Sequence, residues 1–428
     1  MTTPTATDAV RSMKLRAADR INADRARIAA LSHDIHAHPE TAFTEEFACE
    51  RISRDLESTG FTVTRGAYGV ATAFEAVYGT GRFRVVLCAE YDALPDLGHA
   101  CGHNIIAAAA VGAATALRAN AEPLDLTVVV LGTPAEEHGG GKVALLRGGA
   151  FETAVMAAML HPSNAPTPAN TEVVTMQCVD RIAIEFEGRS AHAAIAPHEA
   201  INASDAAHLT QLAIAMLRQQ LRDGIRVAAV TSEAGTVTNI IPARARLDVE
   251  IRSRDDAEMV ETKRRVLECA RGAAIATGCS HSHRRTEPRY MSIQQDPIIA
   301  RAWNENVELL GEPSDPHAAD PGGSTDMGNV SRVVPSIHPF LRLHGAGGPP
   351  HTTAFADAAA GPAGIDCAVT GATLLAWTVL DVAADPTASA LLLDRRAARP
   401  AGATARDFDG DRPRGRIRHR AVGDTESA

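Results

Sequence analysis

The stretch LTVVVLGTPAEEHGGG, residues 126–141, begins with a run of aliphatic and β-branched residues and continues, after a short turn, to two adjacent acids and then to three consecutive glycines. A short apolar run bounded by turn residues predicts a buried strand. Glu136 and Glu137 then stand at the carboxyl end of that strand, where open α/β sheets hold their ligands. A second run, Val85–Cys88, leads in the same way to Glu90 and Asp92. The two runs predict an α/β layer fold with its chemistry at the strand ends.

Outward from these runs, the chain divides into three parts. Residues 1–177 and 293–388 alternate helical stretches with short strands, and we expect one domain in which helices sandwich a mixed β-sheet. Residues 178–292 follow the order β-α-β-β-α-β, which is typical of an inserted ferredoxin-like α+β domain. Residues 389–428 mix arginines with Gly, Pro and Asp without periodicity, so we expect a disordered Arg-rich tail.

Composition narrows the class of partner. The 428 residues carry a formal charge of -10 with both signs interspersed, which predicts neither a nucleic-acid surface nor a polybasic membrane anchor. The polar start of the chain indicates no export signal, and we expect no run that spans a membrane. The 7 cysteines are odd in number and lack CxxC spacing, which argues against a disulfide scaffold. These features favour a cytoplasmic protein that acts on small molecules.

Two motifs carry candidate chemistry. Cys101 and His103 are separated by one glycine, so both can turn toward one ion, although a buried thiol beside a helix-capping loop explains the pattern equally well. At the end of the run 126–131, one of the two acids Glu136 and Glu137 can bind a metal ion while the other takes a proton from the attacking water. The alternative for that pair is a solvated acidic loop.

Two histidines extend the candidate site. His161 ends the apolar run Val155–Leu160, and His351 follows two prolines. Either histidine alone is more often structural. Taken together, five donors would suit a pair of zinc-like ions, with Asp92 orienting a ligand imidazole from behind: Cys101, His103, Glu137, His161 and His351.

At this point the sequence resembles a known family. The motifs are EYDALP (residues 90–95), GHACGHN (98–104), PAEE (134–137) and GSTDMGNVS (323–331). They resemble the dinuclear-metal aminoacylase and carboxypeptidase superfamily, in the subgroup of aminobenzoyl-glutamate hydrolase and β-alanyl-lysine dipeptidase. The resemblance covers residues 28–380.

The resemblance implies a metal-dependent amidohydrolase or peptidase that splits the amide bond of small N-acyl amino acids or dipeptides. Examples are p-aminobenzoyl-glutamate and β-alanyl or γ-aminobutyryl dipeptides. It implies two divalent ions per subunit, zinc or manganese with cobalt as a further option, and a general base at Glu136. The implied metal ligands are Cys101, His103, Glu137, His161 and His351.

The resemblance also gives residues 178–292 a function as a lid and dimerisation domain. The motif SAHAA, residues 190–194, places His192 where the family has a histidine that steadies the developing oxyanion, often in the partner subunit's site. Asn239 and Arg252 fall where the family places groups near the substrate carboxylate, a task suited to an amide and a guanidinium. We therefore expect a homodimer through this domain.

The chain departs from the family pattern at three positions. Asn104 stands where many relatives have Asp, and Glu90 stands where the wider superfamily has a metal-binding histidine. Pro350 replaces the Asn expected before His351. Because Glu90 takes the place of a histidine ligand, we expect His103 to supply that ligand instead. Because Pro350 departs from the family pattern, the placement of His351 is left to be tested by the structure.

Two other functions remain compatible with the residues. Cys101 could act as a nucleophile with His103 or His99 as base, which needs no metal. The chain could also be a binding or scaffold protein that kept the fold and lost catalysis. Activity that survives chelation would favour the cysteine nucleophile. Binding of a substrate without its turnover would favour the scaffold protein.

Overall fold

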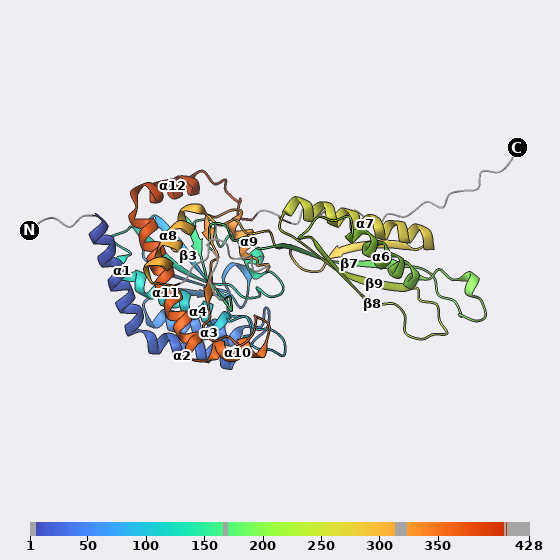
Figure 1. The fold of residues 1–428 in the computed structure, drawn as a ribbon, viewed down its shortest axis with the longest axis horizontal. Coiled ribbons are helices and arrows are strands. Elements are labelled where there is room, and N and C mark those ends of the chain that lie inside the picture. Colours follow the sequence, from blue (N-terminus) through green and yellow to red (C-terminus); the bar gives the residue numbers. More distant parts are fainter. Residues whose placement is uncertain (1–5, 166–169, 313–322, 406–407, 409–428) are drawn as a thin grey trace, which may run out of the picture. The chain divides into compact units, whose positions relative to one another are not determined.

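The computed structural model describes residues 6–165, 170–312, 323–405 and 408, which form two compact units (Figure 1). Unit 1 draws on Met1–Met176 and Ile293–Asp407, and unit 2 on Gln177–Ser292 with Phe408. The sequence set the insertion at residues 178–292; unit 2 begins at Gln177, runs to Ser292 and takes in Phe408 as well.

A six-stranded sheet forms the centre of unit 1. Its order is β1 (Thr62–Arg65), β2 (Phe74–Tyr78), β4 (Leu126–Gly132), β3 (Phe83–Ala89), β5 (Met156–Ala158) and β11 (Ser336–Ile337). The first two pairings are antiparallel and the other three are parallel. The expected mixed sheet is thereby confirmed. A separate parallel pair joins β6 (His161–Ser163) to β12 (Phe340–Arg342).

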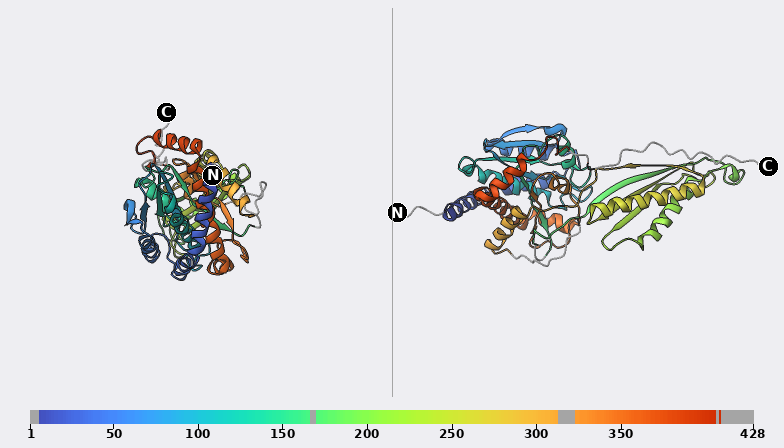
Figure 2. Two further views of the ribbon diagram at one scale, coloured as in Figure 1. Left: turned by 90° about the vertical axis from the view of Figure 1, so that its left-hand side faces the viewer. Right: turned by 90° about the horizontal axis from the view of Figure 1, so that it is seen from above.

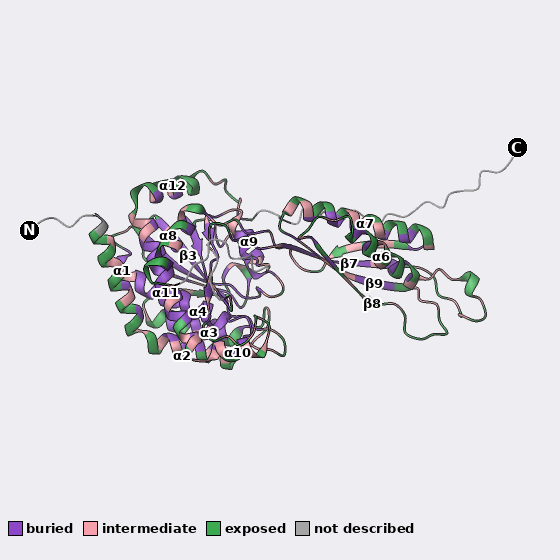
Figure 3. Ribbon diagram, viewed as in Figure 1, coloured by how far each residue is buried: buried purple, intermediate pink, exposed green. Residues whose placement is uncertain are grey.

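Helix α4 (His103–Leu117) packs on β3 and β4, and all of its residues are buried (Figure 3). A helix that is apolar all round belongs in a core. Helices α1 (Ala6–Ala23), α2 (Arg25–Ala37) and α11 (Pro362–Ala384) surround α4, with α1 running beside α11 (Figure 2). The remaining helices of unit 1 are α3 (Glu46–Ser58), α5 (Gly141–Arg147), α8 (Pro297–Leu309), α9 (Met327–Ser331), α10 (Thr353–Ala360) and α12 (Pro386–Ala397), with 3-10 turns η1 (Ala67–Gly69) and η2 (Arg118–Asn120).

Two sequence expectations need correction in this unit. Helix α11 is, by length and composition, long and apolar enough to cross a membrane, although no such run was expected; 83% of its most apolar window is buried inside unit 1, as a core helix would be. Helix α12 continues to Ala397, inside the predicted disordered tail. It has an Asp385 N-cap, and Arg395 donates to Asp296 at 2.7 Å. Residues 406–407 and 409–428 of that tail lie outside the described residues.

Unit 2 has the predicted β-α-β-β-α-β order. Its elements are β7 (Cys178–Glu187), α6 (Ala203–Arg218), β8 (Arg226–Glu233), β9 (Arg244–Ser253), α7 (Asp256–Thr277) and β10 (Ser280–Arg285), with the 3-10 turn η3 (Pro197–Glu199). The antiparallel sheet runs β10-β7-β9-β8, so β8 and β10 are its edges. Helices α6 and α7 pack against each other and on β7 and β9, which buries a second apolar core.

Candidate metal centre

Two neighbouring strands deliver the acidic residues of the site. β3 and β4 pair in parallel with Ala89 opposite Gly132, and both strands end at these residues. Glu90, Glu136 and Glu137 follow them and therefore gather at one edge of the sheet. Glu90 is fully buried and Glu136 is 7% exposed. The predicted placement of the acids at the strand ends is confirmed.

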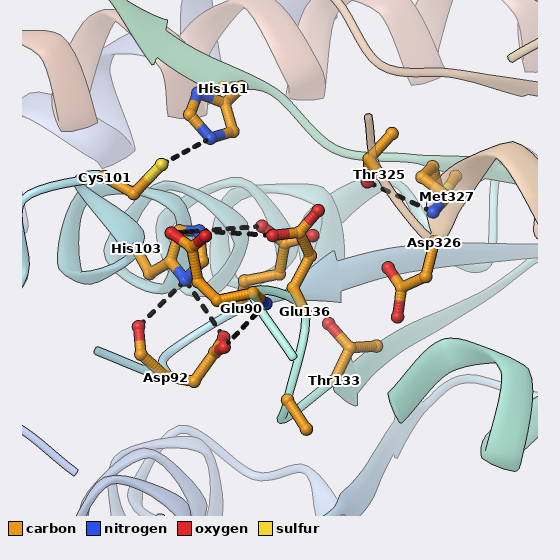
Figure 4. Close-up of polar contacts among 12 residues, drawn as sticks. Glu90, Asp92, Cys101, His103, Thr133, Glu136, His161, Thr325, Asp326 and Met327 are labelled. Atoms are coloured by element: carbon orange, nitrogen blue, oxygen red, sulfur yellow. Dashed lines mark hydrogen bonds and ion pairs between the residues drawn. The ribbon is translucent and has the colours of Figure 1, made fainter. Parts of the chain in front are cut away.

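Cys101 and His103 come from the turn that begins α4. Gly102 between them has a φ of 77°, a left-handed conformation, and a Cβ at this position would lie 2.6 Å from Cγ of Pro162. Glycine alone meets both conditions. The thiol and the imidazole are thereby placed beside the acids at the strand ends (Figure 4).

His161 and His351 reach the same place from other elements. The strand before His161 ends at Ala158, so His161 begins β6 instead of ending the run 155–160, because the chain leaves the central sheet to pair with β12. His351 precedes α10, and its backbone N–H donates to the carbonyl of Ala100 at 2.9 Å. This bond fastens His351 beside the Cys101 turn.

The donor atoms of all five predicted ligands converge. Cys101 Sγ lies 3.5 Å from His161 Nε2 and 3.6 Å from His351 Nε2. Glu137 Oε2 lies 3.5 Å from His351 Nε2, and Glu137 Oε1 lies 3.9 Å from His103 Nε2. Within the described residues, the sets whose donor atoms all lie within 4.8 Å of one another are Cys101–His103–His161, Cys101–Glu137–His351 and Glu90–His103–Glu136. Cys101 belongs to the first and second of these sets, and His103 belongs to the first and third.

The donor set fits divalent metal ions. In the described part of the chain, His103 Nε2 and Glu137 Oε1 are buried atoms without a hydrogen-bond partner. Such atoms cost free energy when they are left unsatisfied. Imidazole, thiolate and carboxylate donors are those that zinc and similar ions prefer. A pair of ions would satisfy both orphaned atoms.

Asp92 lies beside His103 and Glu137, on the side away from their candidate donor atoms. Its Oδ1 lies 3.0 Å from His103 Nδ1, and its Oδ2 accepts from the Glu137 backbone N–H at 2.9 Å. The main-chain oxygen of Asp92 also lies 2.9 Å from His103 Nδ1. A proton held on Nδ1 leaves the lone pair of Nε2 for a metal ion. His161 is oriented similarly, because its Nδ1 lies 2.8 Å from the Pro162 carbonyl.

The adjacent acids have opposite electrostatics. Burial, reinforced by the charges of Glu90 and Glu137, raises the pKa of Glu136 well above its usual value. Burial also acts to raise the pKa of Glu137, but the hydrogen bond with His351 and the charge of His103 outweigh it and hold this pKa at about 2. Glu137 is therefore suited to binding a cation and Glu136 to holding a proton.

The same electrostatics disfavour the cysteine-nucleophile alternative. Burial and the charge of Glu137 raise the pKa of the Cys101 thiol well above its usual value. A metal-free enzyme of that type needs a thiolate near neutral pH. The sulfur of Cys101 instead lies close to the imidazoles of His161 and His351, an arrangement that suits a metal ligand. All 7 cysteines are free.

Three residues that the sequence reasoning did not select also belong to the site. Lys142, at the start of α5, donates to Glu90 and, at 2.6 Å, to Asp326. His338 stacks on His161 with ring centroids 5.6 Å apart. Asp326 lies within the subgroup motif of residues 323–331, and that was the available signal. Nothing near Lys142 or His338 in the sequence distinguishes them.

The other predicted site residues lie in unit 2. His192 pairs with Ile240 in an isolated bridge, and the Ala193 N–H donates to the Asn239 carbonyl at 3.0 Å, so His192 and Asn239 occupy adjacent exposed loops. Arg252 lies at the other end of β9, where its Nε donates to Glu250 at 2.6 Å. Eight strand residues span about 26 Å. The structure therefore brings Asn239 to His192 and separates Arg252 from both within one chain.

A protein-family model matches a large part of the chain. Residues 86–366 match the model of peptidase family M20/M25/M40. This segment contains Cys101, His103, Glu136, Glu137, His161 and His351.

Among curated relatives, the Xaa-Arg dipeptidase of Mus musculus is 36% identical over 391 residues, covering 87% of this chain and 90% of the relative. The Homo sapiens Xaa-Arg dipeptidase is 34% identical, covering 87% and 89%. A p-aminobenzoyl-glutamate hydrolase component of Escherichia coli is 34% identical over 280 residues, covering 60% and 57%.

Solved structures share the fold. A Bacillus subtilis protein described as a dinuclear metal-binding peptidase of the M20 family superposes with a TM-score of 0.66 at 24% identity, covering 84% of this chain and 99% of that one. An aminobenzoyl-glutamate utilization protein from Klebsiella pneumoniae gives a TM-score of 0.68 at 17% identity, covering 86% and 98%.

Proposed function

The chain belongs to peptidase family M20/M25/M40, and from that premise we propose that it is a dinuclear-metal dipeptidase for dipeptides with a basic C-terminal residue. Its family membership makes it a hydrolase and confirms the resemblance inferred from the motifs. The single observation that carries the proposed chemistry is the convergence of the five donor side chains beside Glu136 at one sheet edge.

The described residues supply the parts that amide hydrolysis needs. Bound metal ions would polarise the scissile carbonyl and acidify the attacking water. Glu136, next to the donors, would accept the proton of that water and return it to the leaving amine. His192 and Asn239, adjacent in unit 2, are proposed to hold the developing oxyanion and the substrate, and Arg252 the substrate carboxylate.

The proposed substrate class rests on two supports. The relatives named Xaa-Arg dipeptidase match this chain over about nine-tenths of their length, whereas the p-aminobenzoyl-glutamate hydrolase component matches over 57% of its own. The formal charge of -10 also favours the approach of a cationic dipeptide over that of an anionic glutamate conjugate.

A substrate panel tests the proposal. Protein stripped by chelation and reloaded with zinc, manganese or cobalt is offered β-alanyl-lysine, dipeptides ending in arginine, and p-aminobenzoyl-glutamate. We expect metal-dependent turnover with the highest kcat/KM for the basic dipeptides. A higher kcat/KM for p-aminobenzoyl-glutamate would refute the proposed class of basic dipeptides and put glutamate conjugates in its place. Binding of two ions without turnover of any substrate would support the scaffold alternative. Turnover that survives chelation would support the cysteine-nucleophile alternative.

We further propose a homodimer through unit 2. Helix α6 exposes Leu209, Leu212 and Met216, which are 40%, 59% and 69% accessible and lie on one helix face by their spacing. Beside them β8 is an edge strand, which offers unpaired backbone groups. Light scattering tests this: Met216→Asp should yield monomers, whereas Leu309→Asp, at a 66% exposed site in unit 1, should not. A monomeric wild type with full activity would contradict the proposal.

We propose the cytoplasm as the compartment, since all 7 cysteines are free, as a reducing environment would keep them. Localisation of the tagged full chain in its native host tests this. A secreted, processed product would contradict it.

A further inference from the structure

Three charged side chains lie fully buried directly behind the metal centre: Glu90, Lys142 and Asp326. The Lys142 ammonium donates to Glu90 Oε1 and, at 2.6 Å, to Asp326 Oδ1. The backbone N–H of Lys142 also donates to Asp326 Oδ2 at 2.8 Å, so both oxygens of Asp326 are used. We call these residues the buried triad.

Glu90 differs from Asp92 in how its carboxylate oxygens are used. Asp92 uses both of its carboxylate oxygens, one toward His103 Nδ1 and one for the Glu137 N–H. Glu90 uses Oε1 for Lys142, whereas Oε2 is buried and has no hydrogen-bond partner among the described residues. This oxygen lies 3.5 Å from His103 Nε2, itself a buried atom without such a partner.

The net charge of the buried triad bears on what Glu90 Oε2 would bind. The buried triad contains two carboxylates and one ammonium, so with all three ionised it keeps one negative charge in the interior. Burial acts to lower the pKa of Lys142, but the charges of Asp326 and Glu90 outweigh it and hold this pKa well above the usual value. Lys142 neutralises one of the two carboxylates, and a cation beside Glu90 Oε2 would neutralise the other.

The distances suit a metal ion at this position. Ligand bonds of about 2.0–2.3 Å in a tetrahedral site put neighbouring donor atoms roughly 3.3–3.8 Å apart. The Glu90 Oε2 to His103 Nε2 separation of 3.5 Å falls in this range, as does the 3.5 Å from Cys101 Sγ to His161 Nε2. Glu90, His103 and Glu136 also form one of the donor sets within 4.8 Å (Figure 4).

We propose that Glu90 is a sixth metal-site residue, whose free oxygen contacts the ion held by His103, and that Lys142 and Asp326 are positioning residues that keep this oxygen in place. A purely structural ion-pair cluster would use both oxygens of Glu90 within the protein, as Asp92 and Asp326 do. The inference rests on the dinuclear centre and not on the choice of substrate.

A metal titration of the full chain, without substrate, tests the inference. Metal-stripped protein is titrated with Zn²⁺ or Co²⁺ against a chromophoric chelator, and the Co²⁺ absorption spectrum is recorded. For Glu90→Gln we expect one ion to bind at least about tenfold more weakly, with an altered Co²⁺ spectrum, while the other ion binds as in the wild type. Lys142→Met should weaken the same ion, because the oxygen loses its support.

Two controls separate this effect from loss of stability. Asp55→Asn also changes a buried carboxylate, but one whose partners are Arg27 and Arg51, and it should leave both affinities unchanged. If Glu90→Gln does not fold, Glu90→Asp retains the charge for Lys142 and withdraws the oxygen by one methylene, so it should show the same loss. Wild-type affinities and spectra in a folded Glu90 variant would overturn the inference. A wild type that binds two ions but hydrolyses no panel amide would overturn only the proposed function.

Discussion

Replacing Lys142 with methionine should destabilise the metal-free protein far more than an ordinary lysine substitution does. Lys142 is fully buried between two carboxylates, and its contact with Asp326 at 2.6 Å corresponds to about 6 kcal/mol of attraction at an effective dielectric constant of about 20. Methionine removes the cation and leaves Glu90 and Asp326 facing each other. Breaking a buried pair in this way costs about 3–5 kcal/mol of unfolding free energy.

The loss should depend on pH. Burial raises the pKa of Asp326 to about 6 even with Lys142 present. Because the folded state of such an acid binds more protons than the unfolded state, stability falls as pH rises from about 4 toward about 6. Without Lys142 this pKa rises further, so the deficit of the variant is largest above pH ~6 and shrinks toward pH ~4.

Urea unfolding followed by circular dichroism at both pH values measures the effect. Lys14→Met is the matched control, because Lys14 also pairs with a carboxylate, that of Asp381, but both side chains stay partly exposed, at 14% and 24%; we expect it to cost about 1 kcal/mol or less. If the unfolding free energy of Lys142→Met at neutral pH lies within about 1 kcal/mol of the wild-type value, the reasoning is refuted, because removal of a buried cation between two carboxylates should cost more than that.

Three further outcomes follow from the site. Glu136→Gln should lower kcat by about 10²–10⁴ while metal binding stays intact, since only the proton acceptor is lost; kinetics and metal analysis of the same sample check both parts. Asp92→Asn should weaken metal binding about 10- to 100-fold, because His103 loses its orienting acceptor; a chelator titration measures this, and unchanged affinity would contradict it. Burial raises the pKa of Glu45 from 4.5 to about 7, so its folded form holds a proton that the unfolded form releases, and the stability of the metal-free protein should fall as pH rises across that window. Glu45→Gln should flatten this dependence in denaturation curves, and an unchanged slope would show that another group causes it.

Local pattern was sufficient for most of the fold. The runs at residues 85–88 and 126–131 appear as β3 and β4, and the β-α-β-β-α-β order of unit 2 is as predicted. Pattern was insufficient at the C-terminal side, where Arg-rich composition indicated disorder and the chain instead forms α12. The Asp385 cap of that helix is local, whereas the buried Leu392 and the Arg395–Asp296 ion pair depend on distant partners in unit 1. Composition averaged over the tail concealed the cap and could not reveal those partners.

For the site, local sequence indicated which side chains could bind metal, because thiol, imidazole and carboxylate groups follow the predicted strands or flank a glycine turn; each motif taken alone also fitted a structural function. The resemblance added the assignment of the general base to Glu136. The ligand and general-base functions of these residues stay predictions, whereas their convergence is now described. Lys142 and His338 could not be selected from the sequence, because a single lysine or histidine without a surrounding motif does not indicate a site.

The sequence by itself determined the strand ends, the Cys-Gly-His turn and the family, because each depends on residues within one short stretch or on matched motifs. Only the tertiary structure decided which donors meet. Cys101 and His351 are 250 positions apart, and Lys142 and Asp326 are 184 apart. It also decided that Arg252 lies at the end of β9 distant from Asn239, which precedes that strand in a loop beside His192. Distances of this kind arise from the packing of whole elements, and no local periodicity encodes them.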